Sequence, residues 1–111
     1  MATEKRRSWE GPRVAPYIDR KMRDPEFRIA FSEARARRIK SAIAAAIRHE
    51  RARHRMSQTT LAKRARTTQA VVSRIENANR PYLPSVAVLA RIAIALGTRL
   101  EVSLIRPPRA A

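Results

Sequence analysis

The most constraining feature of the sequence is a pair of short helical patterns, at residues 58–65 and 69–77, with almost no chain between them. The break, "RTTQ", contains neither Gly nor Pro, the residues that usually mark a sharp turn. Thr68 offers another solution, because its hydroxyl can accept hydrogen bonds from the N–H groups that open the second helix. Ser57 can cap the first helix in the same way. The two patterns therefore predict short helices that are joined by a tight turn and lie roughly perpendicular to each other.

The second pattern separates into two faces when its residues are placed about 100° apart, the α-helical rotation. Val71, Val72 and Ile75 fall on one apolar arc. The opposite arc carries small or amide-bearing side chains and one guanidinium, at Gln69, Ala70, Ser73, Arg74 and Asn77. Short side chains let a helix enter the DNA major groove, about 12 Å wide, where amides and guanidinium groups can bond to base edges. This face therefore predicts a helix that reads DNA.

A much longer helical pattern precedes these two. It begins at "DPEF", where Asp24 can accept N–H bonds and Pro25 suits the first helical position, and it runs to about residue 54. Its apolar stripe, expected to face the core, consists of Ile39, Ala42, Ile43, Ala46, Ile47 and Glu50. Another helix is expected to open at Ser85 and to end at Gly97.

The segment "RLEVSLI" alternates with a period of two, which predicts the only strand of the chain. A lone strand cannot satisfy its own edge, so pairing with its copy in a homodimer is expected. The residues expected to form this contact are Leu100, Val102 and Leu104. The predicted organisation is a flexible basic arm at 1–23, a helical domain at 24–97 with the helix-turn-helix at 58–77, a dimerisation strand at 98–106 and a tail at 107–111. The predicted fold class is therefore all-α, with one short strand.

The charge balance favours a polyanionic partner. The 111 residues include 25 Lys and Arg against 9 Asp and Glu, a net charge of +16. Neutralising phosphates would release counterions and favour binding, although a generally basic protein is an alternative explanation. With no Cys and two His, neither a disulfide nor a metal cage is expected, and no catalytic constellation, cofactor motif, membrane span or signal peptide is recognisable. The sequence therefore predicts a cytoplasmic, non-enzymatic protein without metal or cofactor.

Residues 51–97 resemble the lambda-repressor-like helix-turn-helix proteins, also called the XRE family. The matching segments are "SQTTLAKRA", "TTQAVVSRIE" and "LARIAIALG". Arg55 and Arg66 depart from the family pattern, because Gly is common at both positions. If the backbone at Arg66 keeps the left-handed conformation of the family, the Arg costs about 1 kcal/mol there.

This resemblance implies a role in DNA binding, with particular residues expected at the DNA. Contacts to base edges are expected from Gln69, Ala70, Ser73 and Arg74. Contacts to the DNA backbone are expected from Gln58, Lys63, Thr68, Asn77 and Arg80. Arg51 and Glu76 match a structural ion pair between two helices of the family. The implied partner is a pseudo-palindromic operator in double-stranded DNA, bound by a homodimer.

The segments on either side of this unit resemble a smaller group within the family. "DPEFRIAFSEARARRIKSAIAAAIR" before the unit and "LGTRLEVSLIRP" after it are similar to segments of the HigA-type antitoxins of type II toxin–antitoxin modules. That resemblance implies a protein that neutralises a small RNA-cleaving toxin and represses its own operon. The candidate toxin anchors are Trp9, Tyr17, Phe27 and Phe31. Packing of Phe27 and Phe31 on their own helix is an equally weighted alternative.

The sequence is compatible with three functions. The first is an antitoxin that also represses its own operon. The second is a dimeric repressor, of phage or other origin, that acts without a toxin partner. The third is a protein that coats any nucleic acid through its charge, against which the short side chains of the DNA-reading face argue. Charge complementarity does not support the antitoxin, because such toxins are typically basic and so is the arm of this chain.

Overall fold

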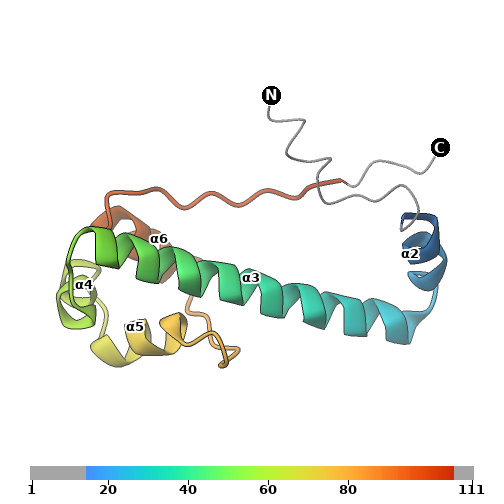
Figure 1. The fold of residues 1–111 in the computed structure, drawn as a ribbon, viewed down its shortest axis with the longest axis horizontal. Coiled ribbons are helices and arrows are strands. Elements are labelled where there is room, and N and C mark those ends of the chain that lie inside the picture. Colours follow the sequence, from blue (N-terminus) through green and yellow to red (C-terminus); the bar gives the residue numbers. More distant parts are fainter. Residues whose placement is uncertain (1–14, 107–111) are drawn as a thin grey trace. The chain divides into compact units, whose positions relative to one another are not determined.

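The computed structural model describes residues 15–106, which form five helices. They are α2 (Ala15–Lys21), α3 (Pro25–Arg53), α4 (Gln58–Arg64), α5 (Gln69–Glu76) and α6 (Val86–Ala95). Arg35–Val102 form one unit, and the described residues on either side of it belong to a second one. Within Arg35–Val102, the helices α4, α5 and α6 gather around the C-terminal part of α3 (Figure 1). The expectation of a helical fold is confirmed.

Helices α3, α4 and α5 begin where capping residues were predicted, and α6 begins with a cap of the same kind. The hydroxyls of Ser57, Thr68 and Ser85 each accept a hydrogen bond from the backbone N–H three residues ahead, at 3.0, 3.2 and 3.3 Å. At the start of α3, Oδ1 of Asp24 accepts from the N–H of Glu26 at 3.0 Å. These bonds satisfy donors that have no partner inside the helix, which explains why α4 and α5 can lie so close along the chain without an intervening Gly or Pro.

Three of the helices end in the same backbone motif. After α3, α4 and α6 the chain passes through a left-handed residue, at Arg55 (φ 50°), Arg66 (φ 54°) and Gly97 (φ 73°). The N–H of this residue and that of the next one return to carbonyls three and five residues back, at 2.9–3.2 Å. The left-handed backbone of the family's glycine positions is therefore kept at both arginines.

The hydrophobic core lies among α3, α4, α5 and α6. Its largest fully buried side chains are Leu61, Val72, Ile75 and Ile92. The other buried apolar residues are Ala44, Ile47, Met56, Ala62, Ala65, Leu89 and Leu96. The apolar arc predicted for α5 is confirmed, because Val72 and Ile75 are completely buried.

The buried face of α3 differs from the predicted stripe. Lys40, Ala44 and Ile47 are buried, whereas Ile39 is 50% exposed and Ala46 lies on the surface. The predicted stripe is thus right at Ile43 and Ile47, which pack in or against the core, and wrong at Ile39, Ala42 and Ala46, which are exposed. The error comes from assigning Lys40 to solvent by its charge. Its apolar stem is in fact buried, and its ammonium group reaches backbone acceptors.

The predicted strand at 98–106 is not present, since no strand occurs within residues 15–106. A strand is defined by backbone hydrogen bonds to a neighbour, and the described part of this chain offers none at that segment. Leu100 packs against the core, while Val102 and Leu104 are 79% and 100% exposed. The alternation detected in the sequence therefore corresponds to an extended segment that is unpaired in a single chain.

The arm predicted at residues 1–23 contains a helix, α2, that was not predicted from the sequence. α2 begins at Ala15 and ends at Lys21, with the basic residues Arg20 and Lys21 in its last turn, where they complement the helix dipole. A helix of seven residues is too short to show an apolar period. Residues 1–14 and 107–111, and with them Trp9, lie outside the described residues. No helix within 15–106 combines the length and apolarity that a membrane crossing requires.

Candidate nucleic-acid interface

α5 presents to solvent the side chains that the sequence assigned to DNA bases. Gln69, Ala70 and Arg74 are exposed, and Ser73 beside them is partly exposed. The opposite side of the helix is buried in the core. The surface available to a ligand is therefore composed of short side chains, one amide and one guanidinium, as a helix that enters a groove requires.

An ion pair joins α3 to α5 behind this face. The guanidinium of Arg51 donates two hydrogen bonds to the carboxylate of Glu76, both of 2.8 Å, and a third to the carbonyl of Met56 at 3.0 Å. The side chain of Glu76 is only 4% exposed. Hydrogen bonding to Glu76 raises the pKa of Arg51 above its ordinary value, with burial acting in the opposite direction. These bidentate hydrogen bonds fix α5 against α3.

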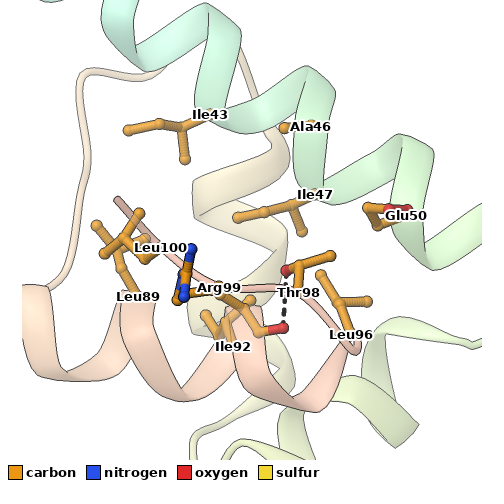
Figure 2. A pocket seen from close by; sticks show the side chains of 11 residues that line it. Ile43, Ala46, Ile47, Glu50, Leu89, Ile92, Leu96, Thr98, Arg99 and Leu100 are labelled. Atoms are coloured by element: carbon orange, nitrogen blue, oxygen red, sulfur yellow. Dashed lines mark hydrogen bonds between the residues drawn. The ribbon is translucent and has the colours of Figure 1, made fainter. Parts of the chain in front are cut away.

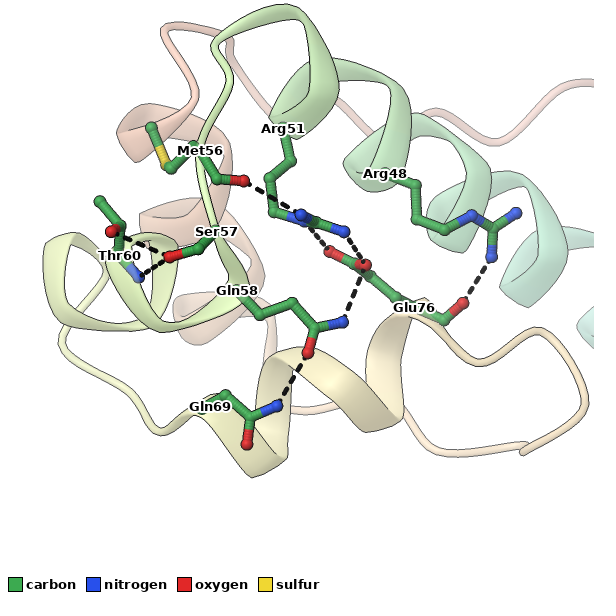
Figure 3. Close-up of polar contacts among 8 residues, drawn as sticks. All are labelled: Arg48, Arg51, Met56, Ser57, Gln58, Thr60, Gln69 and Glu76. Carbon is green, nitrogen blue, oxygen red and sulfur yellow. Dashed lines mark hydrogen bonds and ion pairs between the residues drawn. The ribbon is translucent and has the colours of Figure 1, made fainter.

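A chain of amides continues from this pair to the exposed face (Figure 3). Nε2 of Gln58 donates to Glu76 Oε1 at 3.1 Å, and Oε1 of Gln58 accepts from Nε2 of Gln69 at 2.8 Å. Because Gln58 is held at both ends, its amide orientation is determined. Gln69 is thereby oriented as well, while its carbonyl oxygen and one N–H still point to no partner within the described residues.

The C-terminal end of α5 is held by cations of α3. The ammonium of Lys40 donates to the carbonyls of Arg74 at 2.9 Å and of Ile75 at 2.6 Å. The guanidinium of Arg48 donates to the carbonyl of Glu76. Lys40 is 3% exposed, and this burial lowers its pKa from the ordinary value of 10.5. Neither Lys40 nor Arg48 was predicted to hold α5, because a charged side chain on a helix is usually expected at a solvated surface.

The loop after α5 positions two further side chains. Oδ1 of Asn77, an exposed residue, accepts a hydrogen bond from the N–H of Asn79 at 3.0 Å and so stabilises the turn. The guanidinium of Arg74 lies over the ring of Tyr82, 5.7 Å from the ring centroid. Tyr82 therefore helps to position the Arg74 guanidinium, which is expected to contact a base. No pattern in the sequence around Tyr82 predicts this contact.

The residues expected at the DNA backbone lie around the same face. Three of them are exposed: Lys63 on α4, Thr68 at the start of α5 and Arg80 in the following loop. Gln58 is only partly exposed and uses most of its amide for the contacts to Glu76 and Gln69. Gln58 is therefore primarily an orienting residue, with one N–H left for a phosphate.

The described candidates for protein contacts lie in the other unit. Tyr17 is 50% exposed, with the Lys21 ammonium 5.6 Å from its ring centroid. Phe27 and Phe31 are partly buried against each other, with ring centroids 5.9 Å apart. Both rings are partly exposed.

One pocket in Arg35–Val102 is apolar and lies away from the polar face of α5. It has a volume of about 250 Å³. Side chains of α3, α6 and residues 98–100 line it (Figure 2). Thr98 closes one side of it and donates from Oγ1 to the carbonyl of Ala93 at 2.8 Å. Leu100 also lines this pocket, so its contacts are within its own chain. Among the described residues, no group of three or more His, Asp or Glu side chains is placed to hold a metal ion.

Comparison with known proteins agrees with this geometry. A family model described as helix-turn-helix matches residues 47–102, which is about half of the chain. No significant match was found among the curated proteins or the solved structures. The family is a DNA-binding regulatory one and typically non-enzymatic. The chain therefore belongs to the helix-turn-helix family of the lambda-repressor-like type and is a DNA-binding transcriptional regulator.

Proposed function

We propose that the protein recognises a specific duplex sequence by inserting α5 into the major groove. Base contacts come from Gln69, Ala70, Ser73 and Arg74. The observation that carries this proposal is the bond between Gln58 and Gln69, which orients an exposed amide before any ligand is present. An amide oriented in advance can bond bidentately to adenine at a smaller entropic cost than a mobile one.

Arg74 supplies a second directed contact. Its guanidinium lies over the Tyr82 ring instead of extending freely into solvent, and a guanidinium can bond bidentately to guanine. Lys63, Thr68, Asn77, Arg80 and the remaining N–H of Gln58 contact phosphates and set the register on the duplex. The high positive charge of the chain adds a component that is independent of sequence.

The regulator acts as a homodimer on a pseudo-palindromic operator. Val102 and Leu104 support this part of the proposal, because they are large apolar side chains that the extended segment leaves exposed. Pairing of two such segments would cover these side chains and satisfy both strand edges. The two half-sites are then expected about one helical turn apart.

The antitoxin function rests on the residues that precede the helix-turn-helix match. Residues 15–46 lie outside the matched part of the chain and include α2 and much of α3. Their aromatic side chains at Tyr17, Phe27 and Phe31 are partly exposed and suit an apolar protein contact. In this version of the proposal the protein neutralises a small RNA-cleaving toxin and represses their common operon. The alternative is a dimeric repressor without a toxin partner.

Selection of duplexes from a random pool tests the DNA-binding proposal. Arg74→Ala should lose about 1–3 kcal/mol of affinity for the selected duplex and relax discrimination at one base pair. Arg80→Ala should weaken binding to selected and shuffled duplexes alike and reduce the salt dependence. Equal losses on both duplexes for Arg74→Ala would contradict its role at a base. A pool that yields no common sequence would instead favour the coating protein.

A growth assay separates the antitoxin from the stand-alone repressor. The short reading frame beside this gene is expressed alone and then together with the full chain. Growth arrest that the full chain relieves supports the antitoxin, and Phe27→Ala combined with Phe31→Ala should then abolish the relief. The matched control, Ile39→Ala on an exposed position of the same helix, should leave the relief intact. An absence of arrest favours the stand-alone repressor.

A further inference from the structure

The recognition helix α5 lacks the backbone motif that ends the other helices of its unit. α3, α4 and α6 each end in a left-handed residue, whereas Asn77 at the end of α5 has φ −83°. Within α5, the N–H of Asn77 returns to the carbonyl of Ser73 at 3.1 Å. The last three carbonyls of α5, those of Arg74, Ile75 and Glu76, therefore need hydrogen-bond donors from outside the helix.

α3 supplies donors to all three of these carbonyls. Lys40 binds the carbonyls of Arg74 and Ile75, and Arg48 binds the carbonyl of Glu76. Together with Arg51, which binds the Glu76 carboxylate, these cations follow one face of α3 over about three helical turns. Attachments at several points along a rigid helix fix both the position and the rotation of α5.

Lys40 differs from the other two cations in its surroundings. Lys40 is 3% exposed, whereas Arg48 is exposed and Arg51 is partly exposed. Within the described residues, the buried ammonium of Lys40 contacts two main-chain carbonyls and no carboxylate. It also precedes residues 47–102, so this attachment comes from the part of α3 that lies outside the family match. A buried cation without an acidic partner is costly, and the compensation here is the capping of a helix end.

We propose that Lys40 is a specificity-determining positioning residue that sets the placement of the recognition helix in the groove. The link to recognition is Arg74, whose carbonyl is bound by Lys40 and whose side chain is directed at a base. A shift of this carbonyl moves the backbone of Arg74 and therefore changes the position of its guanidinium relative to the base. Since bidentate contacts depend on geometry, a small displacement lowers discrimination between sequences more than it lowers attraction to phosphates. This inference rests on the proposed function in α5.

The test compares Lys40→Met with Arg38→Met in the full chain. Both variants remove one cation from α3, and Arg38 is exposed about 160° around the helix from Lys40. The first readout is the ratio of dissociation constants for shuffled and selected duplexes. Partial unfolding lowers both affinities by the same factor and leaves the ratio unchanged, so the ratio separates positioning from stability. Lys40→Met should lower the ratio about tenfold, and Arg38→Met should leave it unchanged.

The second readout, amide hydrogen exchange without DNA, does not depend on the DNA-binding proposal. Lys40→Met should accelerate exchange in α5, at Arg74 to Asn77, about tenfold relative to amides of α6. Unchanged exchange in α5, or an unchanged ratio of dissociation constants, overturns the inference. If the wild-type chain shows no sequence preference while exchange responds as expected, the proposed function fails and Lys40 still holds α5. Should Lys40→Met not fold, Arg48→Met at an exposed position carries the same two readouts with a smaller expected change.

Discussion

The two ends of the recognition helix are held in different ways. At its start, the Thr68 hydroxyl accepts an N–H three residues ahead at 3.2 Å. At its end, the carbonyl of Arg74 is bound by Lys40, which is 34 residues away in the sequence. The first contact is local and forms with the helix, whereas the second exists only after α3 and α5 have packed. The start of α5 is thus determined by neighbouring residues, and its end by the tertiary structure.

The largest effect is expected from the ion pair at the tertiary end. Glu76→Ala leaves the Arg51 guanidinium without its acidic partner in a largely buried position, and about 3 kcal/mol of unfolding free energy should be lost. Chemical denaturation measures this loss. Glu101→Ala is the matched control, because Glu101 pairs with Arg99 at 3.1 Å while both side chains are mostly exposed. The control should lose less than about 1 kcal/mol. Similar losses in both variants would mean that burial does not strengthen the attachment of α5.

A smaller loss is expected at the local end. Thr68→Ala removes the acceptor of the Val71 N–H and should lower the unfolding free energy by about 1 kcal/mol. Thr59→Ala, on an exposed position within α4, removes the same atoms without removing a cap and should change it by less than about 0.5 kcal/mol. The comparison of the two ends fails if Thr68→Ala costs as much as Glu76→Ala in the same denaturation experiment.

The sequence predicts contacts between neighbouring residues well, and contacts between residues far apart in the chain poorly. The caps at Ser57 and Thr68 were predicted correctly, because each needs only a hydroxyl three residues before its donor. The exposed face of α5 was also predicted, since it follows from helix geometry. Lys40 was misassigned, because charge alone gives no sign that a lysine will meet a helix end from another element.

The remaining errors have the same origin. Tyr82 was not connected with Arg74, because the loop between them has no period that relates the two side chains. The expected strand is unpaired within the described residues, since alternation reveals a strand-like segment but not its partner. The ion pair between Arg51 and Glu76 was anticipated only through the family resemblance, which carries tertiary information that a single sequence lacks.

A substitution at the left-handed residue after α4 is expected to stabilise the protein instead of destabilising it. Arg66→Gly relieves the cost of a positive φ (54°) at a residue with a side chain and should add about 0.5–1 kcal/mol to the unfolding free energy. Arg38→Gly, inside α3, should lose about 1 kcal/mol, because Gly weakens a helix interior. Thermal denaturation of both variants measures the two changes, and a loss for Arg66→Gly would show that the arginine side chain makes a contact worth more than the backbone strain.

The smallest expected effect is a pH dependence of the unfolding free energy, which distinguishes the contribution of the Lys40 charge from that of its hydrogen bonds. Burial lowers the pKa of Lys40 below 10.5, so the folded chain releases this proton before the unfolded chain does. As pH rises through the lowered pKa toward 10.5, the unfolded state binds more protons, and the unfolding free energy increases. The difference in unfolding free energy between wild type and Lys40→Met, measured by denaturation from neutral pH to about pH 10, should therefore shift in favour of the wild type as the pH rises. A shift in the opposite direction would mean that the bonds to the two carbonyls stabilise the charged form more than burial destabilises it, and that the end of α5 is held mainly by charge.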